Sequence, residues 1–309
     1  MSDIKISDTV INPVSKTKPR SSATRGLIFM AVGMFLFSAG DMLAKYLTAD
    51  FHAVQIMWSR QAGLMGGVVI LIAFRGLSVF RSTHPRLQIT RGAAAAGSGT
   101  IFIFAVAYVP LADAVAVSFV APFMVTIMGA LFLGEKVGIR RWTAVIIGFL
   151  GTLVVIRPGA DAVHPAVFLV LIAAGLFATR QILSRALSDD KTTTTIAYTA
   201  LVSGAILSTA LPIVWKTPQT GQAVLIFVGL AIIAAAAEIC IIKALEFTEA
   251  VIVAPVHYSL IIWGTMYGYV IFNDLPDIWT WVGAAIISTS GIYTLYREHH
   301  LSKQASGTE

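Results

Sequence analysis

Five ionisable side chains stand inside long apolar stretches of this sequence, where a charge is costly. They are Asp41, Arg60, Arg180, Glu238 and His257. A charged group within a membrane span usually faces the protein interior or a wet cavity, and it pairs with another group there. Two acids, two arginines and a histidine in such places indicate three alternatives: contacts to a charged or zwitterionic solute, gates made of ion pairs, or static salt bridges between helices.

The depth of these residues predicts which of them pair. Asp41 lies about six residues before the end of the first apolar run and Arg60 about seven after the start of the second, so at roughly 1.5 Å per residue both are about 10 Å below one surface. Arg180 and Glu238 lie about seven and nine residues from the opposite surface. One acid–base pair is therefore expected in each half of the membrane. Lys45 and Lys243 are nearer to helix ends, where their ammonium groups can snorkel to the interface.

Prolines mark two further places where polar groups are needed. Pro122 and Pro255 each free a backbone carbonyl one turn earlier, which a neighbour or water must satisfy. Ser118 offers a hydroxyl for the first of these. His257, just after Pro255, has two interpretations: it shares a proton with Glu238 in a coupled carrier, or it is a hydrogen-bonded packing residue.

Aromatic rings add a second kind of contact, because a planar ring can stack on a flat ligand such as an isoalloxazine. Tyr258 and Trp263, close to His257, are the preferred cavity-lining candidates; anchoring at the membrane interface is the alternative for such residues. The complete set of expected substrate-binding or gating residues is Asp41, Lys45, Arg60, Ser118, Arg180, Gln181, Glu238, His257, Tyr258 and Trp263.

The elements that must position these residues are membrane-spanning helices. The chain of 309 residues is 57% hydrophobic and only 12% charged, half the charged share of about 25% in a soluble domain. Its mean hydropathy is +0.80. Apolar runs near 20 residues, enough to cross a hydrocarbon core, recur along the whole length. The ten expected helices cover 25–47, 53–74, 90–109, 113–133, 141–156, 164–187, 192–213, 221–247, 250–273 and 277–296.

Lysine and arginine predict the orientation, because they collect in cytoplasmic loops. One side holds sixteen of them, with Arg91 counted in the loop before the third helix, whereas the opposite loops hold only Arg157 and Lys216. Both termini are therefore expected in the cytoplasm, as a disordered segment 1–24 and a tail 297–309. The net charge of +6 thus comes from lysine and arginine residues in the cytoplasmic loops, and it does not indicate nucleic-acid binding.

An internal repeat divides the chain into segments 25–156 and 164–296. Phe37 and Lys45 recur as Phe177 and Arg185, 140 residues later. Five helices per repeat is an odd number, so the second copy must enter the membrane from the opposite face. Inverted repeats are typical of secondary transporters, which bind substrate near mid-membrane where the repeats meet. An inert duplicated scaffold is the alternative.

The stretch 122–157 resembles the EamA domain of the drug/metabolite transporter superfamily. It has a proline-bearing helix, a Gly134-Glu135 pair, a tryptophan and a glycine-rich helix ending in Arg-Pro, and residues 271–298 repeat this order. Asp41-x-x-x-Lys45 and Trp58-x-Arg60 also occur in bacterial members, and the resemblance covers about 25–298. Asn273-Asp274 replaces the Gly-Glu pair in the second copy. Both acids are therefore expected to be loop residues that pair with Lys136 or cap the next helix.

The resemblance implies a carrier that works by alternating access in the bacterial inner membrane, with a cavity lined by helices 1, 3, 4, 6, 8 and 9. Members export amino acids or take up riboflavin or S-adenosylmethionine. On the aromatic residues, riboflavin uptake is the first expectation, with the other two as alternatives. The expected partners are a small molecule and the lipid bilayer, with a coupling proton considered and the oligomeric state open.

Other chemistry is not indicated by the sequence. There is no phosphate-binding Gly-x-x-x-x-Gly-Lys-Ser/Thr loop, no Gly-x-Ser-x-Gly and no His-Glu-x-x-His. Cys240 is the only cysteine, so neither a disulfide nor a cysteine metal site is expected within the chain. We therefore expect no enzyme activity, no cofactor and no metal.

Overall fold

A computed structural model describes residues 20–132, 137–157, 164–187, 189–248 and 250–306, and in these ranges the regular structure is entirely helical. An all-helical chain suits a bilayer, because a helix satisfies its own backbone hydrogen bonds where no water is present. Most of the segment expected to be disordered, 1–24, lies outside the described residues. The first helix begins at Arg20.

The helices follow the predicted order. The first half contains α1 (Arg20–Leu47), α2 (Ala53–Arg75), the 3-10 turn η1 (Gly76–Phe80), α3 (Pro85–Val106), α4 (Leu111–Ser118), α5 (Ala121–Phe132) and α6 (Ile139–Ile156). The second half contains α7 (Val167–Ala186), α8 (Thr192–Val214), α9 (Gly221–Phe247), α10 (Ala250–Val253), the 3-10 turn η2 (Ala254–Tyr258), α11 (Ser259–Phe272) and α12 (Ile278–Ser306).

These helices make ten spanning segments when α4 is counted with α5, and α10 with η2 and α11. Seven of the segments in the described ranges meet the length and hydropathy of a membrane span outright, among them Leu111–Phe132, which joins α4 and α5. A shorter apolar helix covers Trp142–Ile156. The fold is therefore an all-α membrane protein with ten helices in two five-helix repeats.

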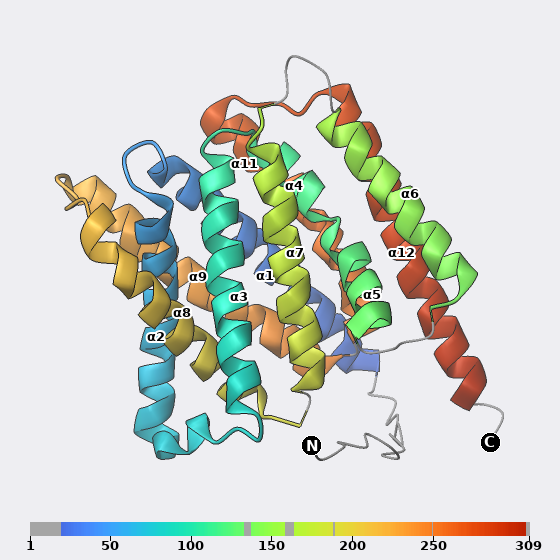
Figure 1. The fold of residues 1–309 in the computed structure, drawn as a ribbon, viewed down its shortest axis with the longest axis horizontal. Helices are drawn as coiled ribbons and strands as arrows, with labels where there is room; N and C mark the ends of the chain where they lie inside the picture. Colours follow the sequence, from blue (N-terminus) through green and yellow to red (C-terminus); the bar gives the residue numbers. More distant parts are fainter. Residues whose placement is uncertain (1–19, 133–136, 158–163, 188, 249, 307–309) are drawn as a thin grey trace, which may run out of the picture.

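The packing of the helices is symmetric between the two repeats. Helix α1 packs on α9, and its counterpart α7 packs on α3; likewise α1 packs on α11, and α7 on α4 and α5. The second helices of the repeats, α2 and α8, pack on each other, as do the fifth helices, α6 and α12, which lie side by side in Figure 1. Exchanging the repeats leaves this set of contacts unchanged, so the two halves are related by a pseudo-twofold axis.

Both proline-bearing segments are interrupted. Just before Pro122, the amides of Phe119 and Val120 bond to carbonyls three residues back, at 3.3 and 3.1 Å, and this tight turn separates α4 from α5. In the second repeat, Pro255 lies in η2, between α10 and α11. A proline cannot donate to the preceding turn, so the α-helical ladder breaks next to it.

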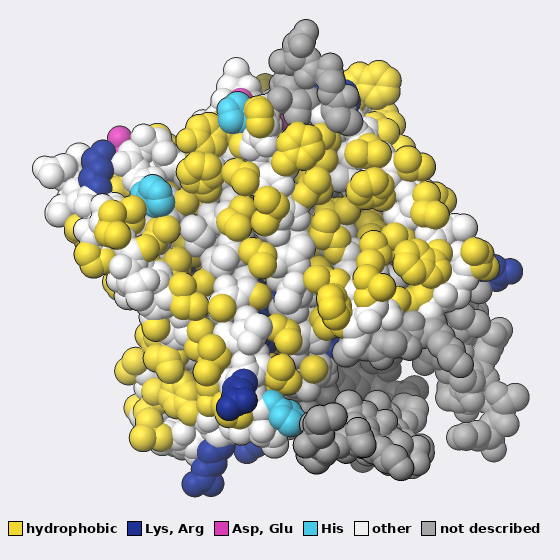
Figure 2. Space-filling model, viewed as in Figure 1, with side chains coloured by type: hydrophobic (Ala, Val, Ile, Leu, Met, Phe, Trp, Pro, Cys, Tyr) yellow, Lys and Arg dark blue, Asp and Glu magenta, His cyan; other side chains and the backbone are white. Residues whose placement is uncertain are grey.

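The lateral surface of the molecule is apolar. Phe74 and Ile213 are 85% and 86% exposed, a degree that water would penalise and lipid would not. Figure 2 shows hydrophobic side chains spread across the middle of one face, with most Lys, Arg, Asp and Glu near its edges. This distribution fits a helical bundle surrounded by lipid.

A loop carboxylate joins the two repeats at one end. Asp190, between α7 and α8, accepts hydrogen bonds from the Thr83 amide at 3.0 Å and from Gln88 Nε2 at 2.8 Å, and a further one from the Ser82 hydroxyl. Partial burial acts to raise the pKa of Asp190, but these hydrogen bonds outweigh burial and lower the pKa to about 2.

Gly63 of α2 lies directly against the backbone of α9 at Ala231. A Cβ atom added there would overlap the carbonyl group of Ala231, whereas one added at Gly66, a turn further along α2, would meet nothing within 4 Å. We expect Gly63→Ala to lower the unfolding free energy by about 1–3 kcal/mol, because the two backbones must separate. Gly66→Ala should unfold at the wild-type temperature. Thermal unfolding of both purified variants in detergent checks this, and equal melting temperatures would contradict it.

Asp190→Asn tests the loop contact. A lowered folded-state pKa stabilises the fold above the unfolded value of about 3.9, and this stabilisation is lost as the pH falls towards 2. We expect Asp190→Asn to melt below wild type at pH 7, and to lose less stability than wild type between pH 4 and pH 2. The neighbouring Asp189→Asn is the control. A wild-type melting curve for Asp190→Asn at pH 7 would show that the contact contributes nothing.

Candidate functional site

The predicted pair between the first two helices is present. Arg60 Nη1 of α2 lies 2.9 Å from Asp41 Oδ1 of α1, and the side chains are 13% and 4% exposed. The Arg60 guanidinium also lies over the ring of Phe37, 4.6 Å from its centroid. Desolvation of both groups makes their separation costly, so the pair holds α1 against α2.

The second predicted pair is also brought together, but loosely. Arg180 Nη2 of α7 lies 3.9 Å from Glu238 Oε1 of α9, and these side chains are 25% and 30% exposed. The Arg180 guanidinium lies 5.8 Å from the ring centroid of Phe177. Its Nε atom is buried and has no hydrogen-bond partner within the described ranges. Of the two predicted pairs, one is therefore tight and buried, and the other is open.

Matched positions of the two repeats differ in burial. The 140-residue shift that relates Phe37 to Phe177 also relates Asp41 to Gln181 and Lys45 to Arg185. Asp41 is buried and Lys45 nearly so, whereas Gln181 and Arg185 are exposed. The C-terminal half of α1 is thus enclosed by its neighbours, and the corresponding half of α7 is open.

Lys45 helps to enclose that end. Its Nζ atom donates to the Val109 carbonyl at 3.1 Å and pairs with Asp274 Oδ2 at 3.1 Å, and it lies over the Phe272 ring. The Lys45 side chain is only 12% exposed, and its ammonium group is bonded to protein groups. Asp274 lies in the loop before α12, as expected, and pairs with Lys45. The carbonyl between α3 and α4 and the acid between α11 and α12 converge on this ammonium group, and they satisfy it inside the protein. Glu135 and Lys136 lie outside the described residues.

A second polar group closes the same end. Thr280 donates its hydroxyl to Asp113 at 2.9 Å and its backbone amide to Asp277 at 2.9 Å, so that Asp277 caps α12. Asp277 also pairs with Arg157, which ends α6 in the left-handed conformation, with φ of 46°. Burial acts to raise the pKa of Asp277, but the Thr280 hydrogen bonds and the Arg157 charge lower it. Helices α4, α6 and α12 are tied together here.

Arg91 is a candidate that the sequence reasoning missed. It was assigned to a loop, but α3 begins at Pro85, so Arg91 lies in the second turn of the helix and is 8% exposed. Its Nε donates to Ser184 Oγ at 2.7 Å, and its Nη1 donates to the Thr199 hydroxyl. Proline at the first helical position was the signal that could have placed this start correctly.

The other predicted residues differ in burial and in the contacts that they make. Ser118 donates its hydroxyl to the Val115 carbonyl of its own helix at 2.7 Å, beside the break between α4 and α5. His257 has an exposed side chain in η2. Tyr258 is buried and packs against Phe119, with ring centroids 5.1 Å apart and the ring planes tilted by 59°.

The remaining aromatic candidate is Trp263 of α11. Its ring meets Phe35 of α1 edge-on at 5.2 Å, and Tyr267 lies on the same phenyl ring at 5.7 Å. The Trp263 Nε1 atom is buried without a hydrogen-bond partner in the described part of the chain.

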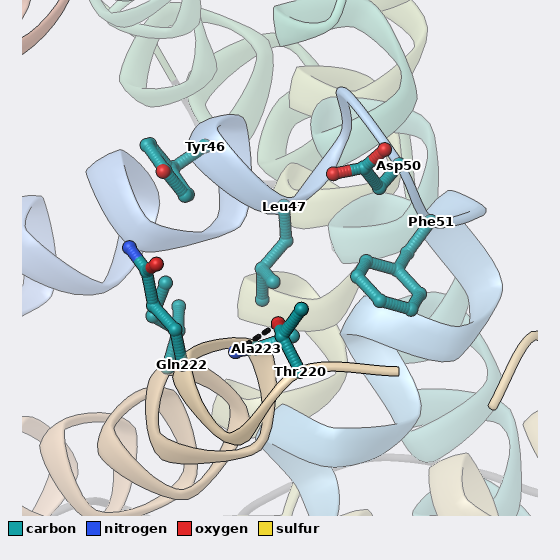
Figure 3. A pocket seen from close by; sticks show the side chains of 8 residues that line it. Tyr46, Leu47, Asp50, Phe51, Thr220, Gln222 and Ala223 are labelled. Carbon is teal, nitrogen blue, oxygen red and sulfur yellow. Dashed lines mark hydrogen bonds between the residues drawn. The ribbon is translucent and has the colours of Figure 1, made fainter. Parts of the chain in front are cut away.

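Two pockets lie away from the charged pairs. One, of about 110 Å³, is formed where α1 ends and α9 begins (Figure 3), with Thr220 capping α9 through the Ala223 amide at 3.2 Å. The other, of about 310 Å³, is lined by Phe104, Tyr108 and His164 among others. Ligand sites usually measure about 300–1,000 Å³ and converge polar groups. The first is too small and the second too apolar, so the charged pairs remain the better candidate site.

Comparison with known proteins agrees with this architecture. The chain is 26% identical to the S-adenosylmethionine uptake transporter of Rickettsia bellii, over 87% of this chain and 94% of that one. It is 27% identical to the riboflavin transporter of Vibrio cholerae, over 86% and 91%, and 25% identical to a pseudopaline exporter of Pseudomonas aeruginosa, over 85% and 93%. A solved crystal structure shares the fold, with a TM-score of 0.60 and 18% identity over 90% of this chain and 98% of the other.

The family model for the EamA-like transporter family matches this sequence twice, at residues 24–157 and 164–297. These two matches fall on the two five-helix halves, whose packing the pseudo-twofold axis relates. The inferred resemblance is confirmed: the chain belongs to the EamA-like transporter family.

Proposed function

We propose that this protein is a secondary transporter that moves a small organic metabolite across the bacterial inner membrane by alternating access, with both termini in the cytoplasm. Its family and its relatives support transport. The distribution of lysine and arginine, sixteen on one side against two on the other, supports the orientation. The enclosed end then faces the periplasm, and the open end faces the cytoplasm.

The observation that carries the mechanism is the unequal burial of matched positions. Asp41 and Lys45 are enclosed, while Gln181 and Arg185, their counterparts in the second repeat, are exposed. In a transporter with inverted repeats, exchanging the conformations of the repeats turns a state open on one side into a state open on the other. The ion pairs of Asp41 and Lys45 would then break in the outward-open state, and they would serve as the outer gate.

The contacts of the aromatic rings and of the charged pairs bear on which substrate is carried. The aromatic rings that favoured riboflavin are largely used for packing, as Tyr258 against Phe119 shows. The charged pairs remain in the interior, and Arg180 and Glu238 are open to one side. We therefore place uptake of S-adenosylmethionine, a charged solute, first. Riboflavin is second, supported by the unpartnered Trp263 Nε1 and by the relatives that carry riboflavin.

A direct transport assay tests the function. We expect cells or vesicles that contain this protein to accumulate labelled S-adenosylmethionine above the level of vesicles without it. Labelled riboflavin and amino acids, offered with and without a proton gradient, show which solutes are carried and whether a proton is coupled. If no organic solute is accumulated or released in any condition, the protein is not a transporter.

A charge exchange separates a gate from a static salt bridge. Asp41→Arg and Arg60→Asp should each abolish transport, because each leaves an unpaired buried charge. The double variant restores the attraction but reverses the charges facing the pathway, so we expect it to recover thermal stability without full transport. The exposed pair Asp50–Lys216, at 4.0 Å, is the control, and its exchange should change neither property. Full transport by the Asp41→Arg/Arg60→Asp variant would make the pair purely structural.

A further inference from the structure

Arg91, Arg180 and Glu238 form a cluster within the cytoplasmic half of the proposed pathway. Ser184 connects the two arginines: its hydroxyl accepts from Arg91 Nε at 2.7 Å and donates to the Arg180 carbonyl at 2.7 Å. Arg91 is therefore fixed to the helical turn of α7 that carries Arg180.

The cluster has more positive charge than its protein partners neutralise. Arg91 donates to two neutral hydroxyls, those of Ser184 and Thr199. Arg180 lies 3.9 Å from the Glu238 carboxylate, too far for a hydrogen bond, and its buried Nε donates to nothing within the described ranges. In the described part of the chain, Glu238 is thus the one carboxylate that pairs with either of these two guanidinium groups. A buried cation without a counter-charge is costly, so this site favours an added anion.

The open pair also offers both signs of charge. Arg180 and Glu238 are a quarter to a third exposed, whereas Asp41 and Arg60 are closed on each other. A guanidinium binds a carboxylate through two parallel hydrogen bonds, and a carboxylate accepts from an ammonium group. A solute with a carboxylate and an ammonium group bonded to the same carbon can enter between Arg180 and Glu238 and replace one weak ion pair by two strong ones.

We propose that this cluster binds the head group of a metabolite that carries a free α-amino acid. The carboxylate of the solute binds the Arg180 guanidinium, its ammonium group binds Glu238, and the positive charge of Arg91 strengthens the anion site. Phe177, under the Arg180 guanidinium, limits how that group can turn. The inference rests on the proposed transport function and narrows its substrate class. S-adenosylmethionine has this head group and riboflavin lacks it.

Competition for transport tests the head-group site. The full-length protein in proteoliposomes is given labelled S-adenosylmethionine, with unlabelled S-adenosylmethionine or its decarboxylated analogue as competitor. The two competitors differ only in the carboxylate. A hydrogen bond to a charged group contributes enough for the analogue to compete about tenfold more weakly, or worse, against the wild type.

Variants show whether Arg180 and Glu238 are responsible. In Arg180→Gln the two competitors should become nearly equal, because only the contact to the carboxylate is lost. Glu238→Gln should weaken both competitors alike, since both keep the amine. Arg86→Gln, an exposed arginine at the same end, is the matched control and should behave as wild type. The ratio between two competitors in one sample does not depend on how much of a variant is folded.

The possible failures are distinguishable. If the wild type accepts both competitors equally, or if Arg180→Gln keeps the full preference, the head-group site is wrong and transport stands. Transport of labelled riboflavin that S-adenosylmethionine does not inhibit also overturns the head-group site alone. If the wild type moves none of labelled S-adenosylmethionine, riboflavin and amino acids, the proposed function itself fails.

Discussion

A charged side chain in a hydrocarbon layer has no water to solvate it, and this constraint governs most of what is specific in the structure. Each charge within the bundle must find its partner on another helix, so it selects which helices are adjacent. The pair of Arg60 and Asp41 holds α2 against α1. Lys45 binds the loop between α3 and α4 and the loop between α11 and α12. Apolar contacts form most of the bundle, but lipid can make similar contacts with each helix. Lipid tails cannot replace the ion pairs.

The helices of the two halves pack in the same arrangement, but the charged residues of the two halves differ. Symmetric helix contacts give the pseudo-twofold axis, and an axis of this kind permits two equivalent end states. The charges break the equivalence, because Asp41 is matched by the uncharged Gln181. A carrier needs both properties: symmetry keeps the two states close in energy, and asymmetry makes one substrate bind where another does not.

The depth of each residue along its helix was sufficient to predict two ion pairs, Asp41–Arg60 and Arg180–Glu238. A charge at a given depth in the membrane can only be paired with a charge at the same depth. Arg91 was left out of this argument, because it was counted in the loop before a helix expected to begin five residues later than α3 does. Depth also did not predict the partner of Lys45. Loops fold back over helix ends, and the position of Asp274 beside Lys45 depends on how α11 and α12 dock.

The sequence by itself determined the membrane class, the helices with their order, the duplicated plan and the family, because these depend on hydropathy, periodicity and local motifs that act over a few residues. Only the tertiary structure decided which end is closed and that Arg91 belongs to the interior. It also decided that Asp41 is paired with Arg60, while Arg180 keeps a donor that no described residue uses. Those features depend on distances between helices that lie far apart along the chain. Side-chain pairing across such distances is settled by the packing of the whole bundle.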